Sequence, residues 1–250
     1  MRKLVIRADD LGYSEAVNYG IERTVRRGCV RSVGVMSNML AAAHGVELLA
    51  GCDVAFGLHA CISAGSPVCA PEEVPSLVGE DGRFLPSSAY RAGEDVATFD
   101  DAYREVRAQL RHLEELLGRR ADYLDVHAVA SVAFMRAIAA VAEEEGLPCS
   151  LVPGADGQTT VGSTSVKLLL PAQIPSTVDD ARALLFSELD AVPQHGCAIA
   201  VCHPGYIDAE LMTTSSLVQS RPLEVAVLSD PALPERLVRE GFELIDYRNL

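Results

Sequence analysis

The sequence predicts an α/β fold in which alternating strands and helices build a parallel sheet or barrel. Short apolar runs rich in β-branched residues alternate with segments of helical spacing, the pattern of βαβ units. Polar residues end several of these runs, and strand ends are where such folds place their chemistry. The chain has 250 residues, 49% of them hydrophobic, which suffices for one sizeable core. We expect a single domain over residues 1–250, without internal repeats or linkers.

The first half of the chain supplies three of the predicted strands. Leu4-Val5-Ile6 begins an apolar run that ends in two carboxylates, and Ser14 follows as the N-cap of a helix. The predicted elements are helices at 15–27 and 41–50 and further strands at 30–36 and 54–59. Residues 60–94 then interrupt the alternation and are rich in Pro and Gly, which is typical of a binding loop or lid.

The second half of the chain resumes the alternation. An amphipathic helix is predicted at 100–117, and Gly146 and Pro148 end another helix. Residues 151–175 are the least regular stretch and contain one short apolar run at 166–170. The remaining predictions are strands at 121–126, 197–202 and 242–247 and helices at 133–145, 178–189, 220–228 and 234–240.

The charge and composition of the chain exclude several kinds of partner. A net charge of −14 and a pI near 4.8 argue against binding to nucleic acid or anionic membranes. No segment has the length and hydrophobicity of a membrane span, and the N-terminus does not have the pattern of a signal peptide. The seven cysteines lack C-x-x-C spacing, which indicates reduced thiols and a cytoplasmic protein.

Four predicted strands end in residues that can bind metals or move protons: Asp9 and Asp10, His59, His127 and His203. Each of them alone also fits an ordinary hydrogen-bonded residue, and the two acids also fit a turn before a capped helix. The ends of parallel strands share one face, so we expect these side chains to converge. Two imidazoles and one carboxylate form a common catalytic metal shell, and a further carboxylate can accept a proton.

Three other residues lie near these strand ends. Asp125 precedes His127 by two positions, so on a strand it would share a face with it and orient it, unless it faces solvent. Cys61 and Cys202 could form a thiolate site, but their spacing favours buried thiols.

Several motifs occur in a specific order along nearly the whole chain. They are Ala8-Asp9-Asp10-Leu11-Gly12, Ser37-Asn38-Met39, Gly57-Leu58-His59, the stretch 67–84, Asp125-Val126-His127, His203-Pro204-Gly205-Tyr206, Ser215-Ser216, Arg221, Leu228 and Leu244-Ile245-Asp246-Tyr247. With these motifs the sequence resembles the YdjC-like carbohydrate deacetylase family, which includes chitooligosaccharide deacetylases. The resemblance implies a distorted (β/α) TIM-like barrel. It also implies hydrolysis of an N-acetyl group from an acetylated amino sugar, and it favours a homodimer.

The resemblance also implies roles for particular residues. Asp10, His59 and His127 would hold one divalent metal ion, Asp9 would be the general base, and His203 lies in a motif of the catalytic face. A His-His-Asp ligand set suits Zn, Mn, Co or Fe, and Mg less well.

Four motif positions outside this set are expected to bind the substrate. They are Arg83, Pro204, Gly205 and Tyr206. Asp9 and Asp10 are adjacent, so their side chains should diverge on an extended backbone, and only one of them can join the metal shell.

One departure from the family pattern bears on the substrate. The family motif continues with two further histidines, and Val129 and Ser131 stand in their places. On the strand both positions alternate onto the same face, so we expect the substrate-facing wall to change from basic to small and apolar. A metal-dependent hydrolase of another amide or ester is therefore an alternative function. A non-catalytic ligand-binding barrel is a rival of a different class.

Overall fold

Nine strands form one sheet in the part of the chain that the computed structural model describes, residues 1–91, 95–170 and 173–250. The strands are β1 Arg2–Leu11, β2 Ser32–Val35, β3 Ala55–Ala60, β4 Tyr123–Val126, β5 Cys149–Ser150, β6 Gln158–Val161, β7 Thr164–Leu169, β8 Cys197–Cys202 and β9 Phe242–Ile245. The helices are α1 Glu15–Arg27, α2 Ala42–Leu48, α3 Phe99–Leu117, α4 Val132–Glu145, α5 Val178–Asp190, α6 Ala209–Thr214, α7 Ser220–Leu228 and α8 Leu233–Arg239.

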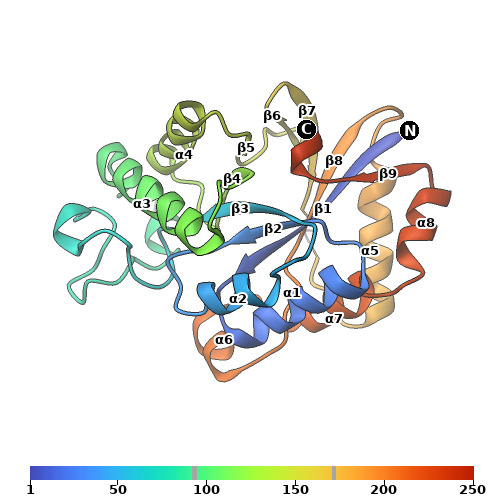
Figure 1. Cartoon of the computed structure of the whole chain (residues 1–250), viewed down its shortest axis with the longest axis horizontal. Coiled ribbons are helices and arrows are strands. Elements are labelled where there is room, and N and C mark those ends of the chain that lie inside the picture. The colour runs from blue at the N-terminus through green and yellow to red at the C-terminus, as the bar shows by residue number, and fades with distance from the viewer. Residues whose placement is uncertain (92–94, 171–172) are drawn as a thin grey trace.

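The sheet is a distorted, nearly closed barrel with the order β5-β4-β3-β2-β1-β8-β7-β6 (Figure 1). Its pairings are parallel except for the β6–β7 hairpin. The end strands β5 and β6 contact each other, which brings the two edges of the sheet together. β9 pairs with the first half of β1, while β2 pairs with the second half. The predicted barrel of mostly parallel strands is therefore confirmed.

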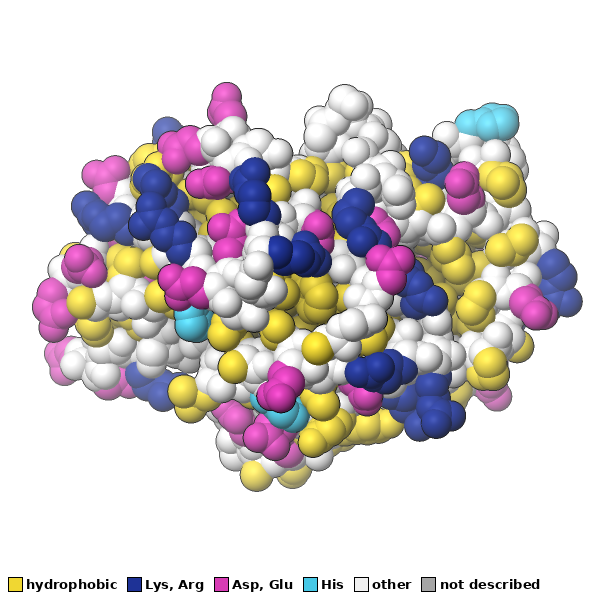
Figure 2. Space-filling model, in the orientation of Figure 1, with side chains coloured by type: hydrophobic (Ala, Val, Ile, Leu, Met, Phe, Trp, Pro, Cys, Tyr) yellow, Lys and Arg dark blue, Asp and Glu magenta, His cyan; other side chains and the backbone are white. Residues whose placement is uncertain are grey.

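Helices cover the outside of the barrel, with α1 and α2 along one side and α3 packed on α4 along another (Figure 1). The hydroxyl of Ser14 accepts the backbone N–H of Val17 and begins α1, as predicted. On the face shown in Figure 2, Lys and Arg side chains are mixed with Asp and Glu. No helix within the described ranges combines the length and hydrophobicity needed to cross a bilayer.

Two stacked tyrosines fill the interior of the barrel. The rings of Tyr123 and Tyr247 lie 3.7 Å apart, centroid to centroid, at an interplanar angle of 7°, and both residues are fully buried. Gly57 on β3 makes room for them, because a Cβ atom there would lie only 2.2 Å from Cε2 of Tyr123. Tyr123 on the neighbouring strand β4 thus requires a glycine at position 57.

Most predicted elements are confirmed with shifts of one or two residues at their ends. The predicted strand 242–247 is too long, because β9 ends at Ile245 and a 3-10 turn, Tyr247–Asn249, follows. The shortest α-helix, α6, and the shortest strand, β5, were not predicted because they carry too few residues to show a period. Residues 151–175 contain the β6–β7 hairpin. Residues 92–94 of the predicted loop lie outside the described residues.

Candidate metal centre

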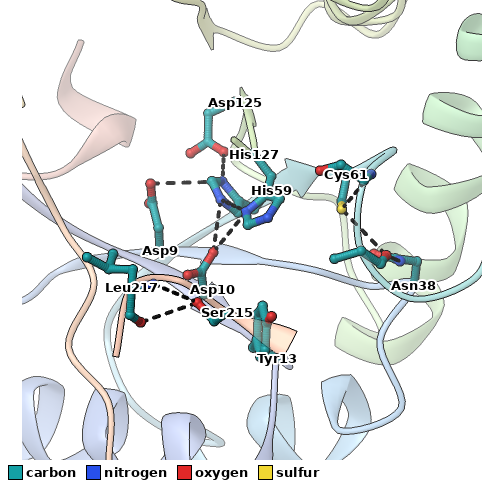
Figure 3. Close-up of polar contacts among 12 residues, drawn as sticks. Asp9, Asp10, Tyr13, Asn38, His59, Cys61, Asp125, His127, Ser215 and Leu217 are labelled. Carbon is teal, nitrogen blue, oxygen red and sulfur yellow. Dashed lines mark hydrogen bonds and ion pairs between the residues drawn. The ribbon is translucent and has the colours of Figure 1, made fainter. Parts of the chain in front are cut away.

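The carboxyl end of β1 is irregular, and this irregularity brings two acids to one histidine. Asp10 has a φ of +73°, a conformation that Asp tolerates better than most residues, and the β1–β2 register shifts there. As a result, Oδ1 of Asp10 lies 3.2 Å from Nε2 of His59, and Oδ2 of Asp9 lies 3.9 Å from Nδ1 (Figure 3). We expected the two carboxylates to diverge. They do approach different nitrogens, but both nitrogens belong to the imidazole of His59.

Three donor atoms converge at the edge of a cavity. His127 directly follows β4, and its Nδ1 lies 3.1 Å from both Oδ1 of Asp10 and Nε2 of His59. Donors around a tetrahedral zinc ion at about 2.0–2.1 Å lie roughly 3.3–3.4 Å from one another. Asp10, His59 and His127 therefore have the donor types and spacing of a site for one divalent cation, and all three line a cavity of about 540 Å³.

A buried arginine determines which oxygen of Asp10 is available to a cation. Nη2 of Arg221 donates to Oδ2 of Asp10 at 2.6 Å, and its Nε donates to the carbonyl of Leu217 at 2.7 Å. Burial raises the pKa of Asp10, but the charge of Arg221 and the two histidine contacts lower it more, so the pKa lies well below its ordinary value. Asp10 is therefore ionised, with one oxygen paired to Arg221 and the other facing the histidines. In the sequence, Arg221 stands out only as part of a motif, without a role.

A second group of possible ligands, Asp9, His59 and Asp125, is already paired with a cation. Arg7 on β1 donates to Asp9 through Nε at 2.6 Å and through Nη2 at 2.7 Å, and its Nη1 lies 2.9 Å from Oδ2 of Asp125. A metal ion between these carboxylates would meet the guanidinium charge, which disfavours it. Burial raises the pKa of Asp9, but Arg7 and His59 lower it more, and it lies below its ordinary value. Sequence reasoning missed Arg7, which has the position of an ordinary strand residue.

Asp125 orients a different histidine from the one predicted. Its register partner on the neighbouring strand is His59, and its Oδ1 contacts Nδ1 of that ring. β4 ends at Val126, so His127 is no longer on the strand and does not share its alternation. The alternative of a solvent-facing acid is also wrong, because Asp125 is fully buried.

The end of β4 also corrects the interpretation of Val129 and Ser131. Ala128 has a φ of +56°, which breaks the strand alternation before these positions. Val129 is buried and lines the cavity. The Ser131 hydroxyl instead caps α4, accepting the N–H of Phe134, and donates to Asp95 at 2.6 Å. The apolar change in the cavity wall is thus limited to Val129.

Of the five remaining predicted residues, His203 lies at the cavity. His203 directly follows β8 and lines the cavity, and its backbone N–H donates to Glu224 at 2.6 Å. Tyr206 donates its N–H to the carbonyl of Ala16 in α1. Within the described residues, the lining of the cavity does not include Arg83, Pro204, Gly205 or Tyr206.

The segment after β3 contributes part of the cavity wall and is tied to α3. Ser63 and Ser87 are among its lining residues. The carboxylate of Glu105 in α3 accepts the backbone N–H groups of Val68 at 2.8 Å and Cys69 at 3.0 Å. The described part of this segment therefore lines the same cavity as Asp10, His59 and His127 and is held to α3.

The two cysteines near the site are buried free thiols, as the spacing indicated. Burial raises the pKa of Cys61 to about 12, and burial also raises the pKa of Cys202. Both are therefore neutral at physiological pH, which is unfavourable for a thiolate site.

Comparison with known proteins gives consistent results. The sequence model of the family described as YdjC-like protein matches residues 3–239. A carbohydrate deacetylase of Geobacillus stearothermophilus is 33% identical over 254 residues, covering 99% of this chain and 97% of the relative. A chitooligosaccharide deacetylase of Klebsiella pneumoniae is 28% identical over 262 residues, covering 100% and 99%. A crystal structure from Enterococcus faecalis V583, described as a proposed cellobiose-phosphate cleavage protein, has a TM-score of 0.81 at 23% identity, covering 99% and 98%.

Proposed function

Because the chain belongs to the YdjC-like protein family, we propose that it is a metal-dependent hydrolase that removes the N-acetyl group of an acetylated amino sugar. The observation that carries the proposal is the convergence of Asp10, His59 and His127 at the cavity. The names of the relatives, carbohydrate and chitooligosaccharide deacetylases, support the reaction and the substrate class.

The three donors would hold one divalent cation, with Asp10 binding through Oδ1 because Arg221 occupies its other oxygen. When bound, such an ion polarises an amide carbonyl and lowers the pKa of water. Imidazole nitrogens in the donor set favour Zn, Mn, Co or Fe over Mg.

Asp9 is the proposed general base. Its pairing with Arg7 keeps it ionised at neutral pH, and a carboxylate that accepts two hydrogen bonds retains lone pairs for a third donor. As the oxygen of water bonds to the amide carbon, Asp9 accepts its proton. His203, at the end of another strand, is the proposed proton donor. It protonates the amine nitrogen as the C–N bond breaks, which gives acetate and a free amine.

The experiment measures acetate release from a panel of N-acetylated amino sugars, including chitooligosaccharides, with bound metal determined on the same samples. The wild type should release acetate, lose activity after chelation and regain it on reloading with zinc or cobalt. Asp9→Asn should keep its metal and lose about 10²–10⁴-fold in turnover. Asp10→Asn should also lose metal. If the wild type releases acetate from none of the sugars, the proposed substrate class is contradicted.

One observation favours a second candidate, the hydrolysis of another amide or ester. The cavity wall includes the apolar side chains of Val129, Leu151 and Leu168, which suit an apolar substrate group better than hydroxyl groups. Adding simple acyl esters and amides to the same panel distinguishes the two, because this candidate predicts their preference over acetylated sugars.

A further inference from the structure

The guanidinium of Arg7 is buried and lines the cavity that contains the candidate metal centre. The residue is only 4% exposed. Two of its nitrogens form a bidentate pair with Asp9, and the third, Nη1, lies 2.9 Å from Oδ2 of Asp125. One side chain therefore contacts both carboxylates that approach Nδ1 of His59.

Two hydroxyl groups hold this guanidinium from the other side. Nη1 of Arg7 donates to Oγ of Ser150 at 2.9 Å and to Oη of Tyr247 at 2.8 Å, and these two oxygens are 2.7 Å apart. Tyr247 is itself fixed by its stacking on Tyr123. The two hydrogens of Nη1 point to the hydroxyls, so Oδ2 of Asp125 accepts no aligned hydrogen bond from the described residues. Asp125 is instead attracted by the positive charge of Arg7.

The contact between Asp125 and His59 has a consequence for the proposed metal site. A carboxylate at Nδ1 holds the proton on that nitrogen and leaves the lone pair of Nε2 free. In this protein Nε2 is the atom that faces Asp10 and His127. The orientation and the tautomer of His59 therefore depend on where Asp125 lies.

We propose that Arg7 is a positioning residue of the metal centre. It fixes Asp9 and Asp125 together and, through Asp125, keeps Nε2 of His59 directed at the other two donors. Lysine cannot replace it, because an ammonium group is a point charge that cannot form the bidentate pair and reach the second carboxylate at once. This inference rests on the metal site of the proposed function, but not on its substrate or its reaction.

The first test compares Arg7→Lys with a matched control, Arg119→Lys. Arg119 also forms a bidentate pair, with Asp122 at 3.2 and 3.0 Å, but at the surface. Zinc affinity of the metal-free proteins is measured by calorimetry, together with thermal unfolding. Arg7→Lys should bind zinc about 10–100-fold more weakly, and the control should equal the wild type. Wild-type zinc affinity in a folded Arg7→Lys overturns the proposal.

Two further variants keep the proposal testable if the lysine variant does not fold. Tyr247→Phe removes only the hydroxyl that holds Arg7, and Tyr103→Phe removes a tyrosine hydroxyl that contacts Glu144 at the surface. The first should weaken zinc binding and the second should not; equal affinities overturn the proposal. Guanidinium added to Arg7→Ala should restore zinc affinity, whereas urea should not, a difference that lost packing alone does not produce.

The outcomes separate this inference from the proposed function. Weak zinc binding in Arg7→Lys supports the positioning role even if the wild type hydrolyses no acetylated sugar, a result that contradicts only the proposed function. Conversely, a wild type that releases acetate, with unchanged zinc affinity in Arg7→Lys, retains the function and overturns the positioning role.

Discussion

Replacing Gly57 with alanine puts a methyl group where the ring of Tyr123 lies. The added Cβ would be 2.2, 2.3 and 2.4 Å from three atoms of that ring. Ordinary carbon contacts are about 3.5–4.0 Å, so the ring must move by roughly 1.3 Å or more. Its movement is opposed by Tyr247, which stacks on it and is also buried.

The magnitude follows from two opposing effects. Overpacking a buried site costs typically about 1–3 kcal/mol, and the rigid stack places this site near the upper value. Alanine also reduces the conformational entropy of the unfolded chain, which returns about 0.4–1 kcal/mol. The net free energy of unfolding should fall by about 2 kcal/mol, and Tm by roughly 4–8 °C for a chain of this size.

The assay is thermal and urea unfolding of Gly57→Ala beside the control Gly79→Ala. At Gly79 a Cβ would meet only the side-chain oxygen of Asp81, at 3.3 Å, so the control should keep the stability of the wild type. Since Tyr247 also holds Arg7, Gly57→Ala should bind zinc more weakly as well. Equal Tm values for the two variants would refute the argument that the tyrosine stack requires a glycine.

Two other predictions follow from the same structure. Alanine at Gly34 would place its Cβ 3.2 Å from both Oδ1 of Asp9 and Cβ of His59. Calorimetry should therefore find the zinc affinity lowered by about tenfold, the smallest effect typical of changes around metal ligands, while Tm changes little. An unchanged zinc affinity contradicts this prediction. Burial raises the pKa of Cys29 to about 12, so at pH 8 its thiol is protonated and should not react with a disulfide reagent until urea unfolds the protein. Peptide mapping that finds Cys29 labelled in the native protein contradicts the second prediction.

The sequence was sufficient to predict the strand–helix alternation and the place where the site forms. Apolar runs of β-branched residues identified the strands, and His59 and His127 were found because each ends such a run. Parallel strands present their ends on one face, so the convergence of these residues with Asp10 followed from topology alone.

The rest of the site depends on contacts between distant parts of the chain. Arg221 and Asp10 pair across 211 positions, and Arg7 and Tyr247 across 240, and no local pattern encodes such pairs. The partner of Asp125 was predicted wrongly because the choice depends on the register between β3 and β4 and on where β4 ends. The left-handed conformation of Asp10 likewise had no signal, since it is not a glycine.

The position of the bound metal tests the central claim most directly. Crystals of the wild type grown with zinc, with diffraction measured on both sides of the zinc absorption edge, locate the ion by its anomalous signal. One peak among Oδ1 of Asp10, Nε2 of His59 and Nδ1 of His127 is the result that we predict. A peak between Asp9 and Asp125, or no peak in the cavity, would contradict the account.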